Sequence, residues 1–192
     1  EILTAEAVER VRAGDMDLAF TTIALPDADF DATPVMRDAF LLVCPPGHPL
    51  AAHQGPLAWD VFTDHAAVGM SGESGIRGIL KEHAAGQLAV SGLAYEVSSV
   101  WGLIRMVRDG LGIAAVPGLV AQAMAAEGIP GFRLAPPIHR TVSLITRAGR
   151  SPTPAAGTLV SAALAQLRNV QSDGIEIPVT EEQLSARGFS AG

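Results

Sequence analysis

The chain has 192 residues, of which 48% are hydrophobic and 17% charged, so it can bury a sizeable core and is not intrinsically disordered. Thirteen Lys and Arg against twenty Asp and Glu give a net charge of −7, and no basic patch is available to neutralise DNA phosphates. We therefore expect that this chain by itself does not bind DNA.

The chain contains one cysteine, Cys44, which excludes an internal disulfide and favours a reducing compartment. Because Cys44 lies in an apolar stretch, we interpret it as a small buried hydrophobic residue rather than a redox switch. The first residues, EILTAEAVER, have no signal-peptide character, and no apolar run approaches the ~20 residues that span a bilayer. These features predict a soluble, cytoplasmic protein.

The first quarter of the chain contains short elements separated by turn signals. A helix is predicted to begin at Thr4, as its N-cap, and to end at Gly14. A short buried strand follows at 16–20, and a polar loop is predicted at 26–34. A long apolar strand at 38–44 ends at the letters PPGHPL, whose Pro and Gly residues indicate a turn.

Strands and helices alternate after this turn. They are predicted, in chain order, as a short helix at 59–65, a strand at 66–70, a helix from 75 to about 83, a strand at 93–96, a helix at 118–127, a strand at 140–147 and a helix at 154–167. The tail, 171–192, lacks helical periodicity, so apart from a short edge strand at 175–179 we expect it to be mobile. The β-α-β order predicts an α/β fold with a parallel-rich sheet.

The stretch EVSSVWGLIRMVRDGLGIAAVP, residues 96–117, is the most informative. Apolar residues at helical spacing predict a buried helix face, Gly110 supplies the left-handed residue that ends the helix, and 111–116 is a short buried strand. Ser98 and Ser99 lie where the helix begins, so we expect one of them to cap it. A helix N-terminus with free N–H groups and hydroxyls is suited to binding an anion.

Three segments carry a resemblance to a known family. They are the stretch just described, AGDMDLAF at 13–20 and FLLVCPPGHPLA at 40–51. Together they resemble the effector-binding domain of LysR-type transcriptional regulators over about residues 4–168, and the GHPLA turn is the most specific match. The resemblance implies a two-lobed, periplasmic-binding-protein-like (type 2) α/β fold with two crossover strands.

The resemblance also implies a domain organisation. Lobe I comprises 1–44 and 143–170, lobe II comprises 45–142, and 171–192 is a C-terminal tail. Lobe I lacks the β-α-β unit with which such a domain opens, and the winged helix-turn-helix of the family is missing as well. We therefore expect a truncated chain.

Candidate ligand-binding residues lie at strand-to-helix turns. By the resemblance, the loop 71–75 is one lip of a ligand cleft, although an ordinary helix cap is the alternative; Arg77 is expected to pair either with a ligand carboxylate or with Glu73. Thr21 and Thr22 follow the carboxyl end of a strand, where open α/β sheets bind ligands. The complete predicted set is Thr4, Thr21, Thr22, Ser71, Ser74, Arg77, Ser98, Ser99 and Pro117.

No catalytic, metal or cofactor site is predicted. The letters GLGIAA match a dinucleotide-binding pattern, but they follow a helix and open a strand, whereas that site needs the reverse order. The five histidines show no i, i+4 pair and no clustering with cysteine, and His48 is interpreted as making a structural hydrogen bond in its turn. We therefore expect no cofactor and no enzyme activity.

The function implied by the resemblance is ligand-controlled transcription. The chain would be the effector-sensing domain of a regulator, binding a small anionic molecule in the interlobe cleft and forming a homo-oligomer, either a dimer or a tetramer. DNA would be contacted only through a winged helix-turn-helix absent from this chain, and no membrane is involved. Two alternatives stay open: a solute-binding protein of a transport system, and a prephenate-dehydratase-like lyase on the same fold.

Overall fold

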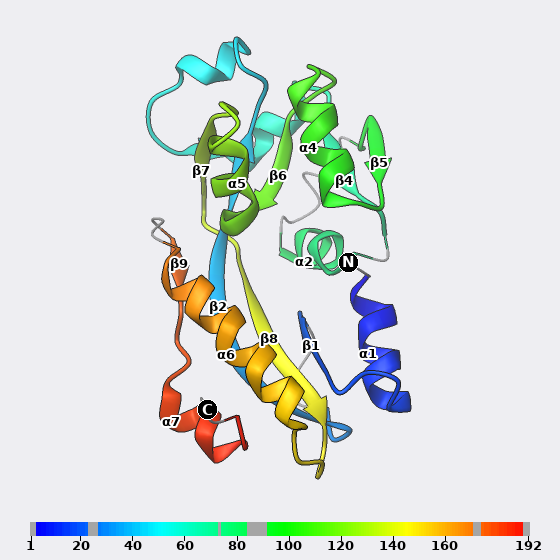
Figure 1. Ribbon diagram of the computed structural model, residues 1–192. Helices are drawn as coiled ribbons and strands as arrows, with labels where there is room; N and C mark the ends of the chain where they lie inside the picture. The colour runs from blue at the N-terminus through cyan, green and yellow to red at the C-terminus, as the bar shows by residue number, and fades with distance from the viewer. Residues whose placement is uncertain (1–2, 23–26, 73, 84–91, 171–173, 190–192) are drawn as a thin grey trace. The chain divides into compact units, whose positions relative to one another are not determined.

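The computed structural model describes residues 3–22, 27–72, 74–83, 92–170 and 174–189 (Figure 1). The chain folds into two compact units: unit 1 consists of Glu1–Arg37 and Thr141–Gly192, and unit 2 of Asp38–Arg140. Among the described residues, no helix combines the length and the hydrophobicity that crossing a bilayer requires.

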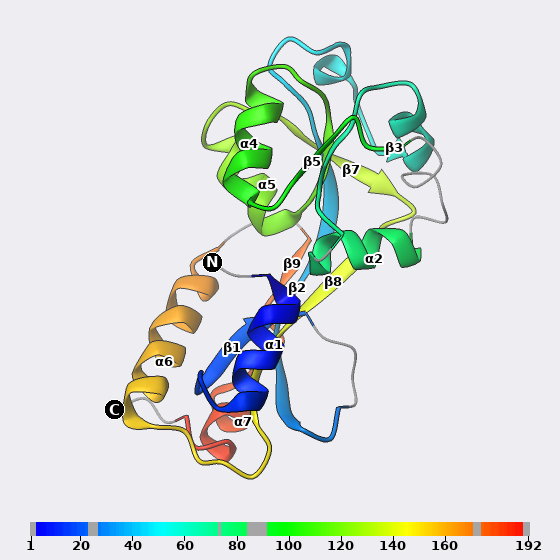
Figure 2. The same cartoon turned by 90° about the vertical axis from the view of Figure 1, so that its right-hand side faces the viewer.

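Unit 1 is built on three neighbouring strands, in the order β1, β8, β2. Its elements are α1 (Thr4–Ala13), β1 (Leu18–Thr21), the first part of β2 (Phe30–Val43), β8 (His139–Arg147) apart from its first two residues, α6 (Pro154–Arg168), β9 (Ile175–Glu176) and α7 (Glu181–Ala186). Strand β1 pairs antiparallel with β8, and β9 pairs with β2. Helix α1 lies beside β1 (Figure 2) and packs the buried Val11 against Phe30 and Ile145.

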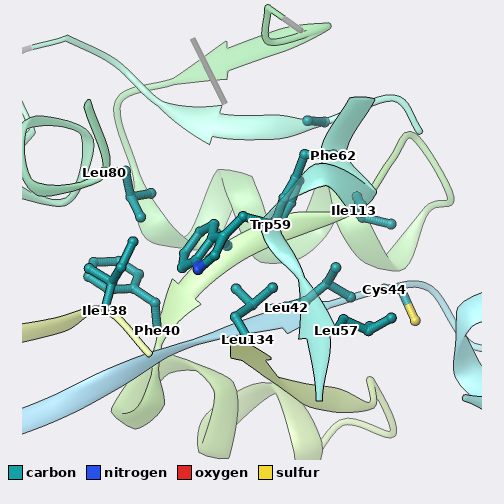
Figure 3. Close-up of a cluster of buried hydrophobic side chains, with 12 residues drawn as sticks. Phe40, Leu42, Cys44, Leu57, Trp59, Phe62, Leu80, Ile113, Leu134 and Ile138 are labelled. Carbon is teal, nitrogen blue, oxygen red and sulfur yellow. The ribbon is translucent and has the colours of Figure 1, made fainter. Parts of the chain in front are cut away.

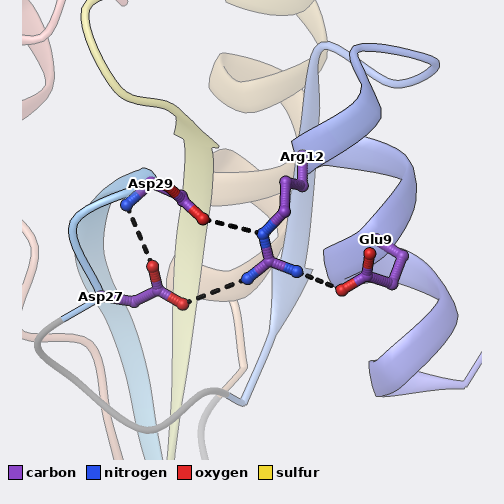
Figure 4. A network of polar contacts seen from close by, with 4 residues as sticks. All are labelled: Glu9, Arg12, Asp27 and Asp29. Carbon is purple, nitrogen blue, oxygen red and sulfur yellow. Dashed lines mark hydrogen bonds and ion pairs between the residues drawn. The ribbon is translucent and has the colours of Figure 1, made fainter.

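Arg12 links helix α1 to the start of β2 (Figure 4). Its Nε donates to Asp29 Oδ2 at 2.9 Å, its Nη2 donates to Asp27 Oδ2 at 3.3 Å, and its Nη1 contacts Glu9. The hydrogen bond with Asp29 is the main reason that the pKa of Arg12 is raised. Its guanidinium carbon also lies 5.0 Å from the centre of the Phe30 ring. This surface cluster holds the turn that precedes β2 against the helix.

Two local predictions for unit 1 are wrong. Leu3 is the N-cap of α1, so Thr4 is the first helical residue and its hydroxyl does not cap the helix. The segment 26–34 is not a continuous loop, because β2 begins at Phe30, whose side chain is buried in the unit 1 core. The polar letters around Phe30 concealed this strand, since they occupy its less buried positions.

The tail contains a helix that was not predicted from the sequence. Thr180 and Gln183 form a capping box, in which each side chain accepts a hydrogen bond from the other residue's backbone N–H, and helix α7 follows. The tail buries Val179, Leu184 and Phe189. The letters TEEQ match the capping-box pattern, so a sequence signal for this helix was present.

Unit 2 combines part of a mixed sheet, a separate two-stranded sheet of β4 and β5, and helices. Its elements are the second part of β2, η1 (Pro49–Ala52), β3 (Leu57–Ala58), η2 (Trp59–Thr63), β4 (Val68–Met70), α2 (Gly75–His83), β5 (Tyr95–Val97), α4 (Val100–Arg108), β6 (Ala114–Pro117), α5 (Gly118–Ala125) and β7 (Gly131–Ala135). β3 pairs parallel with β7, and β4 parallel with β5. β2, however, pairs antiparallel with β6 and β7, so the sheet is less parallel than predicted. The chain enters unit 2 through β2 and leaves through β7 and β8, which therefore run the opposite way.

The larger core of unit 2 packs around Trp59 (Figure 3). Its indole Nε1 donates to the carbonyl oxygen of Pro136 at 2.8 Å, so the polar edge of the ring is satisfied while its apolar faces are buried. Cys44 lies in the same cluster with no exposed surface, and burial raises the pKa of its thiol to about 11. The interpretation of Cys44 as a buried hydrophobic residue is confirmed.

Two glycines hold the segment between α4 and β6 in place. Gly110 has φ of +83° and follows the end of α4, as predicted. At Gly112, a Cβ would lie only 2.3 Å from the carbonyl oxygen of Ala66, so a side chain does not fit. This close approach allows the parallel bridge between Ala67 and Ile113, which sets β6 beside the start of β4.

Candidate functional site

Two strand-to-helix turns of unit 2 meet at one edge of β4 and β5. Val68 of β4 lies opposite Tyr95 of β5 and Met70 opposite Val97, in parallel register. The backbone N–H of Ser71, just after β4, donates to the carbonyl oxygen of Val97 at 2.8 Å. Because parallel strands end at the same edge, the loop before α2 and the loop before α4 emerge together. The structure thus makes neighbours of two loops that are distant in sequence.

The first of these loops positions Ser71 and Ser74. The N–H of Ser74 donates to the carbonyl oxygen of Ser71 at 3.0 Å, and Ser74 in turn accepts from the N–H of Gly78 at 3.0 Å. Ser74 is buried and Ser71 half-buried. The loop therefore enters α2 through ordinary turn geometry, with its two hydroxyls at the carboxyl edge of β4.

The second loop contains Ser98 and Ser99. Ser99 occupies the N-cap position of α4, with extended backbone, but its hydroxyl makes no capping hydrogen bond within the described part of the chain. Ser98 is exposed and Ser99 half-buried. The expectation that one serine caps α4 is therefore wrong. The hydroxyl of Ser99 and the first N–H groups of the helix are left available as donors.

Arg77 lies in the first turn of α2, and its side chain is only 10% exposed. Its Nε is buried and has no hydrogen-bond partner among the residues that the structure describes. Among the residues that the structure describes, the carboxylate that comes within 4 Å is that of Glu96 on β5, where Nη2 and Oε1 are 3.8 Å apart and the Glu96 side chain is 53% exposed. Such a distance permits ionic attraction but exceeds that of a hydrogen bond. A buried guanidinium without a full set of acceptors is suited to binding an anion.

Glu96 was not among the predicted site residues. Glu73, the predicted alternative partner of Arg77, lies outside the described residues. The approach of Glu96 to Arg77 depends on the pairing of β4 with β5, which places it opposite Gly69. No local pattern in the sequence gives that register. The only signal was its position two residues before Ser98, on the same side of an extended strand.

Pro117 ends β6, where it is buried opposite Phe40 of β2. The parallel bridge between Ala67 and Ile113 gives β6 the direction of β4, so the carboxyl end of β6 points to the same edge as that of β4. Three strands of unit 2 therefore direct their carboxyl ends toward one edge, which carries six predicted residues: Ser71, Ser74, Arg77, Ser98, Ser99 and Pro117.

The other three predicted residues belong to unit 1. Thr4 is half-buried at the start of α1. Thr21 is the last residue of β1, and it is buried opposite Ser143 of β8. Thr22 follows it and is half-buried. Their part in ligand binding stays a prediction.

A second arginine of unit 2, Arg140, is half-buried and makes two hydrogen bonds to a carboxylate. Arg140 donates from Nε to Asp38 Oδ1 at 2.7 Å and from Nη2 to Asp38 Oδ2 at 3.3 Å. Asp38 has no exposed surface and also accepts from the N–H of Leu119, at the start of α5, at 3.0 Å. This contact joins the beginning of unit 2 to its end. It was also not predicted, because Asp38 and Arg140 are 102 positions apart.

The histidines do not form a metal site among the residues that the structure describes. His48 Nδ1 accepts from the N–H of Leu50 at 3.2 Å, which confirms the predicted structural hydrogen bond. Burial and the nearby His65 both lower the pKa of His48, so its imidazole is neutral and can accept. Within the described ranges, no three His, Cys, Asp or Glu side chains are placed to hold a metal ion.

Comparison with known families decides the class of the chain. The family model described as the LysR substrate binding domain matches residues 1–168. The chain belongs to this family. Its fold is the periplasmic-binding-protein-like α/β fold, as the resemblance implied.

The chain is also similar in sequence to a curated transcriptional regulator, over more residues than the family model matches. The chain is 28% identical over 184 residues to the uncharacterized HTH-type transcriptional regulator YbhD of Escherichia coli (strain K12), and the match covers 95% of this chain. It covers 57% of YbhD, so this LysR-family chain spans little more than half of that relative's length.

Two solved structures share the fold of this chain. The effector binding domain of QuiR in complex with shikimate matches with a TM-score of 0.71 at 18% identity, covering 87% of this chain and 79% of that one. The CcmR regulatory domain of Synechocystis PCC6803 in complex with 2-PG matches with a TM-score of 0.69 at 17% identity, covering 88% of this chain and 82% of that one.

Proposed function

We propose that this chain is the effector-sensing domain of a LysR-type DNA-binding transcriptional regulator. In this proposal a small anionic molecule binds at the edge where β4 and β5 meet α2 and α4, with Arg77 as its main cationic contact. The single observation that carries the placement is the buried Nε of Arg77, which has no hydrogen-bond partner in the described part of the chain.

The chemistry of the edge supports an anionic effector. A buried cation without hydrogen-bond acceptors is unfavourable, and an anion with two oxygens supplies both the opposite charge and the acceptors. The hydroxyl of Ser99 makes no capping bond, and the first turn of α4 presents N–H groups that favour negative charge. Hydroxyls, amides and a guanidinium together match a carboxylate or a phosphate.

The ligands of two fold relatives fit this chemistry. Shikimate, bound to the QuiR domain, carries a carboxylate, and the CcmR domain was solved with 2-PG. These ligands indicate which molecules to test first, not which one this chain recognises. The match to the LysR family also favours a regulator over a solute-binding protein or a lyase.

Regulation would follow from a population shift. An effector that binds one conformation more tightly raises the population of that conformation, and subunit contacts in a homo-oligomer pass the change to separate DNA-binding modules. The chain itself, with its net charge of −7, would not bind DNA, and the whole regulator would work in the cytoplasm. A low-salt gel-shift titration of this chain should show no complex with DNA.

Calorimetric titration tests the proposal. Shikimate, 2-phosphoglycolate and a panel of other small carboxylates and phosphates are titrated into the wild-type chain, together with uncharged amides of the same carbon skeletons. We expect binding of at least one anion and none of the corresponding amide. Arg77→Met should reduce the affinity about ten- to a hundredfold, because a hydrogen bond to a charged group contributes roughly 1.5–3 kcal/mol.

Arg105→Met is the matched control, because it also removes one arginine of unit 2. Arg105 is exposed on the last turn of α4 and pairs with Asp109 at 2.8 Å. It should leave the affinity unchanged. Equal losses in the two variants, or undiminished binding in Arg77→Met, would contradict the proposed site.

A further inference from the structure

Glu96 stands in an unusual relation to Arg77. Its carboxylate is the nearest one to the buried guanidinium in the described part of the chain, yet the two groups form no hydrogen bond at 3.8 Å. Arg77 is almost fully covered, with 10% of its side chain exposed, whereas 53% of the Glu96 side chain is in solvent. The carboxylate therefore lowers the cost of the buried charge by attraction, without being fixed in place by it.

The contact involves one side of the guanidinium. Nε and Nη2 form the edge on which a carboxylate or phosphate binds with two parallel hydrogen bonds. Glu96 faces Nη2, and Nε has no partner among the described residues. An anion that took both donors would occupy the place next to Nη2 where the Glu96 carboxylate now lies. The exposed side chain of Glu96 is free to move into water when that happens.

From this geometry we infer that Glu96 is an internal carboxylate that competes with the effector for Arg77. The inference rests on the proposed function, because it concerns the same site. In the absence of effector, Glu96 partly neutralises Arg77. An effector has to displace Glu96 and overcome the repulsion between two anions. Glu96 therefore lowers the affinity of the site for anions and favours ligands with two coplanar oxygens, which can take both donors of Arg77.

Glu96→Gln separates competition from simple support. If Glu96 competes, the variant binds shikimate, 2-phosphoglycolate or inorganic phosphate about tenfold more tightly than the wild type by calorimetry. The same variant should have a lower melting temperature without ligand, because Arg77 loses its counter-charge, and a larger rise in melting temperature when the anion is added. A role confined to positioning Arg77 would instead weaken binding.

Glu82→Gln is the matched control. Glu82 lies on α2, the same helix as Arg77, and its side chain is 77% exposed. Its substitution changes the net charge equally but leaves Arg77 and Glu96 in place, so the anion affinity should not change. An equal gain in both variants would show a general effect of net charge and overturn the inference.

The remaining outcomes separate this inference from the proposed function. Binding that Arg77→Met abolishes but Glu96→Gln leaves unchanged or weakens overturns the competition and preserves the proposed site. Anion binding that is indifferent to Arg77 overturns both. Failure of all three probes to bind to either the wild type or Glu96→Gln also overturns the inference, whereas binding of another anion in the larger panel would leave the proposed function standing.

Discussion

Unit 2 contains two arginines that lie mostly out of solvent beside a carboxylate, Arg77 buried and Arg140 half-buried, and the two pairs differ in their hydrogen bonds. Arg140 makes two hydrogen bonds to Asp38, which has no exposed surface and accepts a third from Leu119. Arg77 meets Glu96 only at 3.8 Å and keeps an unpartnered Nε within the described residues. We call Arg140 and Asp38 the closed pair, because they are hydrogen-bonded to each other. We call Arg77 and Glu96 the open pair, because Arg77 keeps a donor that no described residue accepts from.

The difference distinguishes a structural contact from the site that we propose for anion recognition. A buried ion pair whose donors and acceptors are all used is costly to break and leaves no group for a ligand. A buried cation with unused donors contributes little to the folded state, yet it provides a strong contact for an incoming anion. Substitutions in the two pairs should therefore have opposite profiles, in stability and in affinity.

The largest expected effect concerns the closed pair. Asp38→Ala should lower the free energy of unfolding by about 3–5 kcal/mol, because it leaves Arg140 with an uncompensated charge and the N–H of Leu119 without its acceptor. Urea denaturation measures this loss. Asp60→Ala, which removes an exposed aspartate from η2, serves as control and should change stability by less than ~0.5 kcal/mol. A loss below 1 kcal/mol for Asp38→Ala would remove the distinction between the pairs.

The open pair should respond in the opposite way. Arg77→Met is expected to keep the unfolding free energy of the ligand-free chain within about 1 kcal/mol of wild type, since it replaces a poorly compensated buried charge with an apolar side chain. The loss should appear in anion affinity instead. Arg140→Met, measured in parallel by urea denaturation, should be strongly destabilising. Similar stability losses in both variants would mean that Arg77 is as structural as Arg140.

Ser99 sharpens the comparison at the helix N-terminus. Because its hydroxyl does not cap α4, Ser99→Ala should lower the free energy of unfolding by less than the ~1 kcal/mol that is typical of a lost cap. If the hydroxyl donates to the bound anion, the affinity should fall about fivefold, which corresponds to ~1 kcal/mol. Thr153→Ala offers the contrast, since Thr153 caps α6 through a 3.2 Å hydrogen bond from Ala156. A large stability loss in Ser99→Ala with unchanged affinity would return Ser99 to a capping role.

The smallest effect is a pH dependence at His48, whose hydrogen-bonding is complete only while it is neutral. The folded chain lowers the pKa of His48, so the unfolded chain binds the proton more readily. The stabilisation is present above the unfolded pKa of about 6.5 and is lost as the pH falls through the lowered pKa of the folded state. His48→Asn should keep an acceptor for the Leu50 N–H and reduce the loss of stability between pH 7.5 and 5.5 in urea denaturation. Identical pH profiles would contradict this assignment.

Local signals predicted much of the fold because they act within a few residues. The helix that became α4 and its stop at Gly110 follow from helical spacing and a glycine able to adopt positive φ. The N-terminus of α1 was misplaced by one residue, because the N-cap position is occupied by Leu3, whose side chain cannot cap a helix, and not by Thr4. The first residues of β2 were missed, since their polar letters suit a loop until a sheet partner satisfies their backbone.

The candidate site divides in the same way. The serines at the two strand-to-helix turns, and Arg77 beside them, could be named from the sequence, because turn chemistry and helix capping depend on neighbouring letters. Glu96 could not, since its distance to Arg77 depends on the register of β5 against β4.

The sequence by itself determined the family, the turn chemistry and the side chains proposed to bind an anion, because these depend on short-range patterns. Only the tertiary structure decided which charges meet. Arg140 is hydrogen-bonded to Asp38, whereas Arg77 forms no hydrogen bond with Glu96. This difference depends on strand pairing and burial, which arise when segments far apart in the chain pack together.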